Sequence, residues 1–530
     1  MTTLGDLRAY WLGAVVCMGG FLFGYDSGII GGVLTFSTFE NDFDFTKKQK
    51  TRISSLCVSL QQLGAFVACF FVIPFTHRFG RKSTILLSSV VFCIGAMLQT
   101  VPSKSLACFY VGRVIAGLGL GTMTYCVPMF NAEMSPTHLR ARLGSFFQLF
   151  YTLGIFTSYW IDYGVQNNMA NSGSRQWQIP VGLQILFAGL LGIGVLTLKE
   201  STRWLANQDR YEEALASLAW IRADDGAKTA QEMAEIRASI QYERQERAGL
   251  TVQGKSYSSR LSSREPCQLT SCPEFFQWPV LKRMIGGFTV FLAQQATGAT
   301  AFAYYGPQYF SLLAGGNETR SLLLTGIFGA VKVFACGLFV WLAADRWGRK
   351  ANLTVGALGM AACQIVTAVV VKTRPAPSDG SVPPSSKATV ALIYLFVMIY
   401  NSGWGPLPWP YVNELYSIRH REVGVAVAVS SQWLWNFVFT IATPYMIDDM
   451  GWGTFLLWGL FDVVIAIGTF FFAHETKGLT LEEAAHPELF TDPANNKLDH
   501  ERAVSRDGSS SGVGKTTDRV RERGVDARVD

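Results

Sequence analysis

One acidic residue lies inside the first long apolar stretch of the chain. Asp26 carries the only acidic or basic side chain in residues 10–36. An acidic side chain at the centre of a membrane-spanning helix costs at least about 2.5 kcal/mol, so such residues usually face the bundle interior, a partner charge or water. Asp26 therefore indicates a pathway for an ion or a polar compound. The alternative is that a hydroxyl or backbone group of a neighbouring helix satisfies it.

A second group of polar residues consists of amides deep inside later apolar stretches: Gln148, Gln294, Asn401 and Gln432. At about 1.5 Å per residue, each lies about 10–20 Å into its stretch, so we expect them to converge near mid-depth. Amides donate and accept hydrogen bonds at once, which suits a ligand rich in hydroxyl groups. Hydrogen bonding between helices is the alternative explanation for any one of them.

Long apolar helices must position these side chains. The 530 residues are 49% hydrophobic and only 16% charged, which is typical of a polytopic membrane protein. About twelve stretches of roughly 20 residues are long enough to cross a bilayer. They are expected near residues 10–36, 53–75, 83–101, 106–130, 143–164, 178–198, 283–311, 321–344, 351–372, 388–416, 423–448 and 451–473.

Short basic segments all fall on one side of these spans, beginning at His77, Ser135, Asp345 and Ser417. That side is expected to be cytoplasmic, together with both termini. The expected domains are an N-terminal six-helix bundle (1–198), a cytoplasmic helical linker domain (199–279), a C-terminal six-helix bundle (280–473) and a largely disordered cytoplasmic tail (474–530).

The two halves repeat one pattern of charges. A basic segment follows the second span and again the eighth, and a Glu and an Arg seven residues apart follow the fourth span and again the tenth. Duplicated halves are typical of transporters, and ion pairs at helix ends suit a protein that alternates between two states. The alternative is that the basic residues only fix the topology. The residues expected to form such pairs are Glu133, Arg140, Asp345, Arg349, Glu414 and Arg421.

Several motifs together resemble those of the sugar porters of the major facilitator superfamily, and the resemblance to fungal-type monosaccharide transporters covers about residues 10–485. The motifs are FGYDSG, RFGRK, DRWGRK, ESTRWL, QQATG, GPLPW and HETKGLTLEE. The resemblance implies an all-α membrane fold. It consists of twelve transmembrane helices in two six-helix bundles, with a cytoplasmic helical domain between them and one substrate site that alternates between the two faces.

The resemblance also implies roles for single residues. Proton-coupled members pair an Asp on the first helix with an Arg on the fourth, and the matching positions are Asp26 and Arg113. Each lies about 10–15 Å from the outer end of its span, so the two can meet. A carboxylate binds a proton less readily beside a guanidinium than away from it, which allows loading and release. A static buried pair in a facilitative carrier stays open as an alternative.

The substrate positions implied by the resemblance are Gln148, Gln294, Gln295, Trp409 and Trp433, and the site departs from the family's usual residues at Thr300, Lys332, Asn401 and Gln432. A cation such as Lys332 near the site could pair with the carboxylate of a uronate or quinate, or it could snorkel or pair internally. The GPLPWP run contains three prolines, so it cannot form a regular helix. It is expected inside the protein or beside a water-filled cavity, as an inner gate.

These observations predict a proton-coupled monosaccharide transporter in the plasma membrane, with a sugar and a proton as ligands, the lipid bilayer as its surroundings and the monomer as its functional unit. The alternatives are a facilitative sugar carrier, a sugar-acid or quinate permease of the same fold, and a non-transporting nutrient sensor. No catalysis, metal, cofactor or nucleic-acid partner is expected. Asn317 lies in a glycosylation sequon on an expected outer loop.

Overall fold

The computed structural model describes residues 4–136, 139–169, 173–252, 278–311, 318–342, 348–374, 383–416, 421–473 and 475. Within these ranges every regular element is a helix. They belong to one compact unit, Met1–Lys477. Asn317, Asp345 and the expected tail, apart from Glu475, lie outside the described residues, as does the side chain of Arg140.

Six long helices make up the N-terminal half, with the short α2 (Ser37–Asp42) between the first two. They are α1 (Leu4–Val33), α3 (Lys47–Phe79), α4 (Arg81–Thr100), α5 (Leu106–Met134), α6 (Arg140–Met169) and α7 (Arg175–Leu196). The bounds agree with the first six expected spans. In the packing, α1 lies against α6, and α5 lies between α3 and α4. Thr46 and Gln49 form a capping box at the start of α3, which satisfies backbone N–H groups there.

The C-terminal half contains two spans that are each split into two helices. Its helices are α11 (Trp278–Ala296), α12 (Ala299–Ser311), α13 (Glu318–Leu342), α14 (Arg349–Thr373), α15 (Pro384–Asn401), α16 (Pro408–Leu415), α17 (Arg421–Met450) and α18 (Trp452–Phe472). The break between α15 and α16 lies at the predicted GPLPWP run. The break between α11 and α12 was not predicted. It occurs at Gly298, whose φ of +76° favours glycine.

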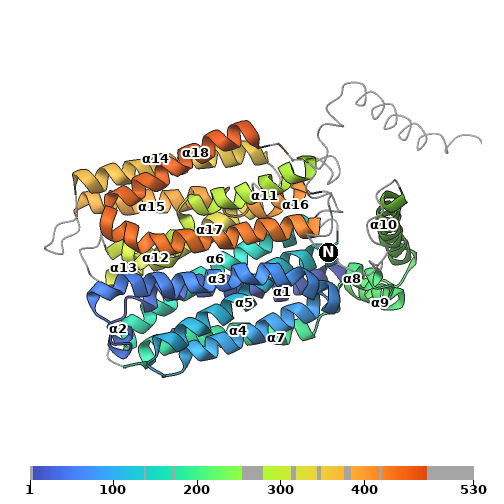
Figure 1. Cartoon of the computed structure of the whole chain (residues 1–530), viewed down its shortest axis with the longest axis horizontal. Helices are drawn as coiled ribbons and strands as arrows, with labels where there is room; N and C mark the ends of the chain where they lie inside the picture. Colours follow the sequence, from blue (N-terminus) through green and yellow to red (C-terminus); the bar gives the residue numbers. More distant parts are fainter. Residues whose placement is uncertain are drawn as a thin grey trace, which may run out of the picture. The chain divides into compact units, whose positions relative to one another are not determined.

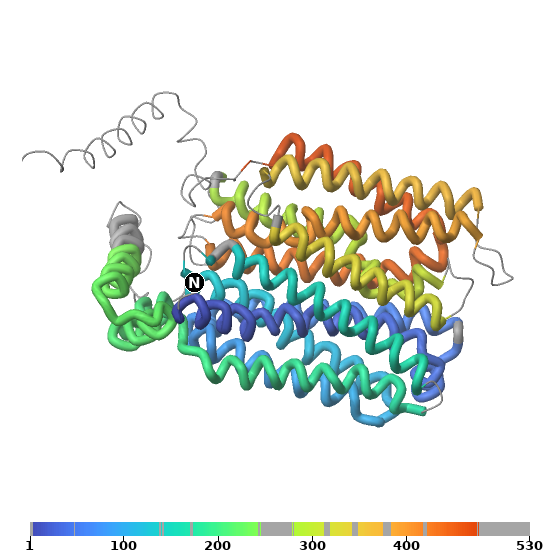
Figure 2. Tube along the Cα trace, turned by 180° about the vertical axis from the view of Figure 1, so that it is seen from behind, coloured from blue at the N-terminus to red at the C-terminus, as the bar shows by residue number. Residues whose placement is uncertain are grey.

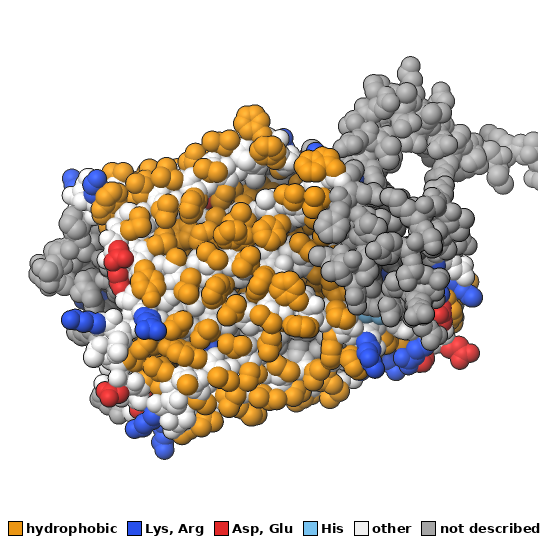
Figure 3. Space-filling model, viewed as in Figure 1, with side chains coloured by type: hydrophobic (Ala, Val, Ile, Leu, Met, Phe, Trp, Pro, Cys, Tyr) orange, Lys and Arg blue, Asp and Glu red, His pale blue; other side chains and the backbone are white. Residues whose placement is uncertain are grey.

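Nine of the described helices are long and apolar enough to cross a membrane: α1, α3, α4, α5, α7, α13, α14, α17 and α18. The other three expected spans fall on α6 and on the pairs α11–α12 and α15–α16. Figure 3 shows hydrophobic side chains over the lateral face of the bundle and charged side chains near its two ends. The chain is therefore a multi-pass membrane protein.

Among the described helices, the two halves meet mainly where α3 packs on α17, α6 on α13 and α1 on α12, with a smaller contact between α5 and α17. In Figures 1 and 2 the N-terminal helices, blue to cyan, lie side by side, and so do the C-terminal helices, yellow to orange. Any site that lies between the halves therefore draws on residues from both.

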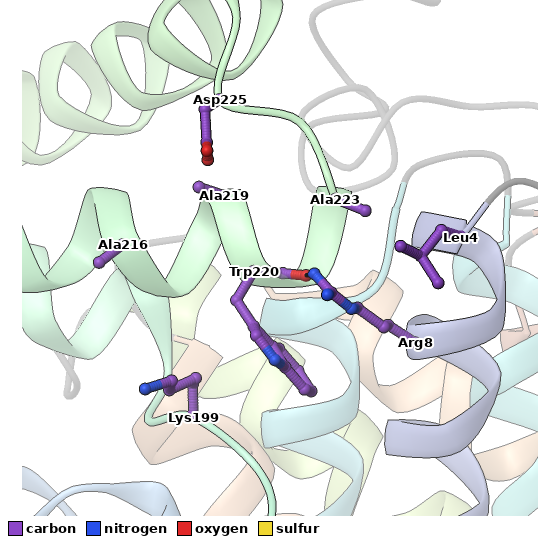
Figure 4. A pocket seen from close by; sticks show the side chains of 8 residues that line it. All are labelled: Leu4, Arg8, Lys199, Ala216, Ala219, Trp220, Ala223 and Asp225. Carbon is purple, nitrogen blue, oxygen red and sulfur yellow. Dashed lines mark hydrogen bonds between the residues drawn. The ribbon is translucent and has the colours of Figure 1, made fainter.

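Three further helices follow α7: α8 (Thr202–Asn207), α9 (Tyr211–Arg222) and α10 (Ala227–Val252). Helix α9 is held to the start of α1, because Arg8 Nη1 donates to the carbonyl oxygen of Trp220 at 2.6 Å. A hollow of about 480 Å³ lies at this junction, lined by Leu4, Arg8, Lys199 and residues of α9 and the loop after it. Figure 4 shows the side chains that line it. This hollow lies at the beginning of α1, several turns from Asp26.

Candidate functional site

The buried pair predicted from the sequence is present. Arg113 Nη1 on α5 lies 2.8 Å from Asp26 Oδ1 on α1, and both side chains are almost completely buried. Gln61 on α3 donates from Nε2 to the other carboxylate oxygen of Asp26. Arg113 Nε donates to the carbonyl oxygen of Cys57 at 2.7 Å. Three helices of the N-terminal half therefore converge on one carboxylate.

Parts of this cluster lack a hydrogen-bond partner. Within the described part of the chain, Arg113 Nη2 and Gln61 Oε1 are buried and unpaired. Buried polar groups are hydrogen-bonded in the great majority of cases, and leaving one unpaired costs about 1–3 kcal/mol. Incomplete hydrogen bonding is more typical of groups that exchange partners than of a static structural pair.

The predicted amides gather around the break between α15 and α16. Gln294 Nε2 on α11 donates to the carbonyl oxygens of Trp404 at 2.8 Å and Gly405 at 3.2 Å. A methyl group placed on Gly405 would lie 3.3 Å from Gln148 Nε2 of α6 and 3.4 Å from Asn401 Oδ1. Residues from both halves therefore surround the same short stretch of non-helical backbone.

The oxygen atoms of this amide group are available to a ligand. Within this amide group, several buried side-chain oxygens have no hydrogen-bond donor among the described residues: those of Gln294, Gln295, Asn401 and Gln432. Thr300 at the start of α12 interacts with Tyr400 beside them. Hydroxyl groups of a bound ring compound would supply the missing donors.

The two predicted tryptophans contact residues across the seam between the halves. Trp409 on α16 packs edge-on against Phe147 of α6, with ring centroids 5.3 Å apart. Trp433 on α17 lies 5.0 Å from the ring of Phe23 on α1, and its Nε1 donates to Thr124 Oγ1 on α5 at 3.1 Å. Trp433 therefore bridges the halves, while Trp409 offers an aromatic ring near the amide group.

Lys332 on α13 is a buried cation at the contact between the halves. Its side chain is 1% exposed, and its Nζ lies 5.6 Å from the ring centre of Tyr151 on α6 and 5.7 Å from that of Phe328. Aromatic faces attract a cation, but less strongly than a carboxylate does. Among the described residues no carboxylate pairs with Lys332. Tyr151 lies one helical turn from Gln148, so this ammonium group borders the amide group.

Ion pairs connect helices at the end of the bundle where α1 begins. Arg81 Nη2 lies 3.1 Å from Glu133 Oε1 and 2.7 Å from Glu422 Oε1. Glu133 belongs to α5 and Glu422 to α17, so Arg81 connects the two halves. In the second half Arg349 Nη2 lies 3.5 Å from Glu414 Oε1, which repeats the Arg81 to Glu133 contact. Arg421 is placed at the start of α17.

A repeated carboxylate caps the helix after each of the two basic segments. Glu200 Oε1 accepts hydrogen bonds from the backbone N–H groups of Arg81 and Lys82, each at 3.0 Å. Glu475 accepts from the N–H groups of Arg349 and Lys350 at 2.8 and 3.1 Å. Burial raises the pKa of Glu200, and the N–H donors only partly oppose this effect. Anionic caps at helix N-termini are favourable, and they hold α4 and α14 at equivalent places.

Several contributing residues were not predicted from the sequence. Gln61 contacts Asp26, and Glu422 contacts Arg81. Neither was predicted, because amides inside apolar helices and acids in polar turns are common. Asp162 on α6 and Asp462 on α18 are completely buried acids. They gave the same signal as Asp26, an acid inside an apolar stretch, and only the resemblance gave Asp26 its separate role.

Comparisons with known proteins establish the family. A family described as "Sugar (and other) transporter" matches residues 12–486. The chain belongs to the sugar porter family of the major facilitator superfamily. This transporter is 32% identical to a quinate permease of Emericella nidulans, over 96% of its own length and 95% of that protein. It is 33% identical to a probable quinate permease of Aspergillus clavatus, over 90% and 86% of the two chains.

Solved structures confirm the twelve-helix fold of the transporter. The proton:xylose symporter XylE bound to 6-bromo-6-deoxy-D-glucose matches 91% of this chain and 99% of its own, with a TM-score of 0.72 and 23% identity. The inward-open xylose transporter XylE of E. coli matches with a TM-score of 0.70 and 23% identity. The predicted fold class and family are therefore confirmed, and the transporter is not an enzyme.

Proposed function

We propose that this sugar porter couples the movement of a polyhydroxylated ring compound to the movement of a proton. The observation that carries the proposal is the buried Asp26, held by Arg113 and Gln61 from two other helices of the same half. In the coupled cycle, Asp26 has either Arg113 or a proton as its partner. The unpaired atoms of Arg113 and Gln61 support this exchange over a static pair.

The ligand is proposed to bind where residues of both halves meet. Gln148 and the unpaired oxygens of Gln294, Gln295, Asn401 and Gln432 supply hydrogen bonds, with Thr300 beside them. Trp409 covers an apolar face of the substrate ring. Trp433 contacts Phe23 of the N-terminal half, so substrate binding at Trp433 affects the contact between the halves. Because both halves contact the ligand, binding favours the movement of one half against the other that alternating access requires.

The proposed substrate class is a hydroxylated ring that carries a carboxylate, with neutral monosaccharides as the second candidate. Lys332 supports the acid, because its buried amine lies beside aromatic rings and no carboxylate among the described residues pairs with it, so a carboxylate on the ligand would supply a counter-charge. The relatives named as quinate permeases support the same class. By this proposal Lys332 selects the carboxylate, and the amides bind the hydroxyl groups.

The proposed orientation places the ends of the bundle that carry Arg81 and Arg349 in the cytoplasm, together with both termini, in the plasma membrane. Residues 199–279 then form a cytoplasmic domain between two bundles, 1–198 and 280–473. The concentration of basic residues in the short segments at that end supports this orientation.

The experiment measures uptake of labelled quinate and labelled glucose into transporter-null cells, with and without a protonophore. Accumulation of quinate that a protonophore abolishes is the expected result. Asp26→Asn should lose accumulation but keep exchange, whereas Asp462→Asn, which removes a buried acid of the other half, should keep both. Lys332→Met should lose quinate uptake by about tenfold or more, since a charge-assisted contact contributes about 1.5–3 kcal/mol.

The possible outcomes separate the parts of the proposal. Normal accumulation by Asp26→Asn would remove this residue from the coupling role. Glucose uptake that is unchanged in Lys332→Met, with no quinate uptake by the parent, would favour the neutral sugar. If neither probe enters although the protein reaches the surface, the carrier proposal for these substrates is wrong and the nutrient-sensor alternative gains support.

A further inference from the structure

Asp162 is a buried acid that the coupling mechanism above does not use. It lies on α6, completely buried, about 10 Å from the end of that helix that is proposed to face outward. Within the described residues neither of its carboxylate oxygens has a hydrogen bond of good geometry, and no Lys, Arg or His forms an ion pair with it. The backbone N–H of Gly32 is the group near it that favours a negative charge. An ionised carboxylate requires water or donors, so the observed surroundings fit the neutral acid.

The position of Asp162 is close to the seam between the halves. Its Oδ2 lies so near to Gly32 of α1 that a methyl group on Gly32 would be 2.2 Å from it. At the preceding residue, Gly31, helix α1 meets α12: a methyl group on Gly31 would lie 2.4 Å from the carbonyl oxygen of Tyr304. The outer end of α1 is therefore packed between Asp162 and the C-terminal half.

The titratable groups that face Asp162 are tyrosines. Tyr25 of α1 and Tyr159 of α6 lie near it, and Tyr304 of α12 lies beyond Tyr159. The hydroxyl of Tyr25 donates to Pro180 O at 2.9 Å, and that of Tyr159 donates to Ala303 O at 2.6 Å. Both hydroxyl protons are therefore engaged elsewhere, and neither stabilises a negative charge on Asp162.

We propose that Asp162 is a second proton-binding site, and that it must hold a proton for the outer end of α1 to close against α6 and α12. When the outer end opens, water reaches the carboxyl and the proton leaves to the outside; before closure a proton returns from the same side. This proton does not cross the membrane, so the site controls closure without changing the transport stoichiometry. The inference rests on the proposed orientation and is independent of the role of Asp26.

The test measures how fast a membrane-impermeant thiol reagent, added from outside, labels a cysteine at position 27. Ser27 Oγ lies 3.3 Å from the hydroxyl of Tyr304 across the seam, so it becomes accessible only when α1 and α12 separate. Three full-length proteins carry Ser27→Cys and Asp26→Asn. The second also carries Asp162→Asn, and the third carries Asp462→Asn as a buried acid away from this seam. A protein without Ser27→Cys gives the background from the native cysteines.

The labelling rate of the first protein, divided by that of the second at the same pH, removes the pH dependence of the thiol itself. This ratio should rise by about threefold or more between about pH 4.5 and about pH 7.5, because Asp162 loses its proton and the outer end stays open. The labelling rate of the third protein, divided by that of the second, should rise by the same factor. A ratio that stays constant, or an Asp462→Asn protein that behaves like the Asp162→Asn protein, overturns the proposal.

Gly32→Ala gives a second measurement if Asp162→Asn does not reach the membrane. The added methyl group displaces the carboxyl from α1, so labelling at position 27 should be faster than in the first protein at every pH. Equal labelling would contradict the proposal. Protonophore-sensitive accumulation in a protein that carries Asp162→Asn alone would be retained, which separates this site from the coupling role of Asp26.

Discussion

At the scale of single residues, unpaired amide oxygens beside the break after α15 support the proposed ligand site. Gln294 has two roles, because its Nε2 holds the carbonyl oxygens freed by the break after α15 and its Oε1 remains available. Gln364 on α14 is also buried, but it packs near Gly459 of α18, away from this break. Comparing substitutions at the two glutamines therefore distinguishes an effect on ligand binding from the general effect of removing a buried amide.

Gln294→Ala should raise the KM for the transported compound by about tenfold, because about 1–1.5 kcal/mol is lost for each missing hydrogen bond and the freed carbonyls move. Gln364→Ala, the control, should leave KM within about twofold, because Gln364 lies away from the break and its Nε2 has no hydrogen-bond partner among the described residues. Initial uptake rates over a range of substrate concentrations measure both. An unchanged KM in Gln294→Ala would exclude it from the site.

Charged residues inside the membrane spans could be predicted from the sequence, and the residues that hydrogen-bond or pair with them could not. Asp26 and Arg113 stand out because acids and guanidinium groups are rare in hydrocarbon. Gln61 gave no comparable signal, since amides also serve ordinary helix contacts. Arg81 was predicted only as part of a basic segment. Its contact with Glu422 joins residues 341 positions apart, which no local pattern indicates.

At the scale of helices, the two breaks in the C-terminal half lie beside the proposed ligand site. The break after α15 could be predicted from three prolines that lack N–H groups. The break at Gly298 could not, because the apolar pattern continues through it and glycine is common in membrane helices. There the backbone has φ of +76°, and a methyl group would lie 2.7 Å from the ring of Trp458.

Gly298→Ala should lower the thermal unfolding temperature of the purified transporter by several degrees. The left-handed backbone alone costs a non-glycine residue about 1–2 kcal/mol, and the ring of Trp458 must also move. Gly337→Ala is the matched control: Gly337 lies inside α13 with nothing within 4 Å of an added methyl group, so the change should be neutral or stabilising. Equal effects of the two substitutions would contradict this account of the break.

At the scale of the whole molecule, the halves are connected at both ends of the bundle. Arg81 and Glu422 join them at the end where α1 begins, whereas Ser55 Oγ donates to the carbonyl oxygen of Ile441 at 2.7 Å nearer the other end. Each of these contacts must break before the halves can separate at that end. The family fold could be predicted from span number and repeats, but the relative position of the halves depends on such distant contacts.

Glu422→Gln should shift the population toward opening at the end that carries Arg81, by about fivefold, since a partly exposed ion pair contributes about 1 kcal/mol. A reporter cysteine at Thr124, which bridges to Trp433 across the seam, should then be labelled faster from the cytoplasmic side of inside-out vesicles. Glu232→Gln, which removes the pair with Arg222 in the helices after α7, is the control and should leave labelling unchanged. Faster labelling in both would show that the link at Arg81 has no special role.

Direct backbone contact between α1 and α6 limits how this chain can vary over evolutionary time. A methyl group on Gly24 would lie 1.9 Å from the carbonyl oxygen of Tyr151, and one on Gly154 would lie 2.1 Å from that of Phe21. Neither position has room for any side chain, whereas lipid-facing residues such as Phe334 and Val464 are largely exposed and accept most apolar types. Neutral drift should therefore accumulate on the outer surface, and this seam should change only through paired, compensating substitutions.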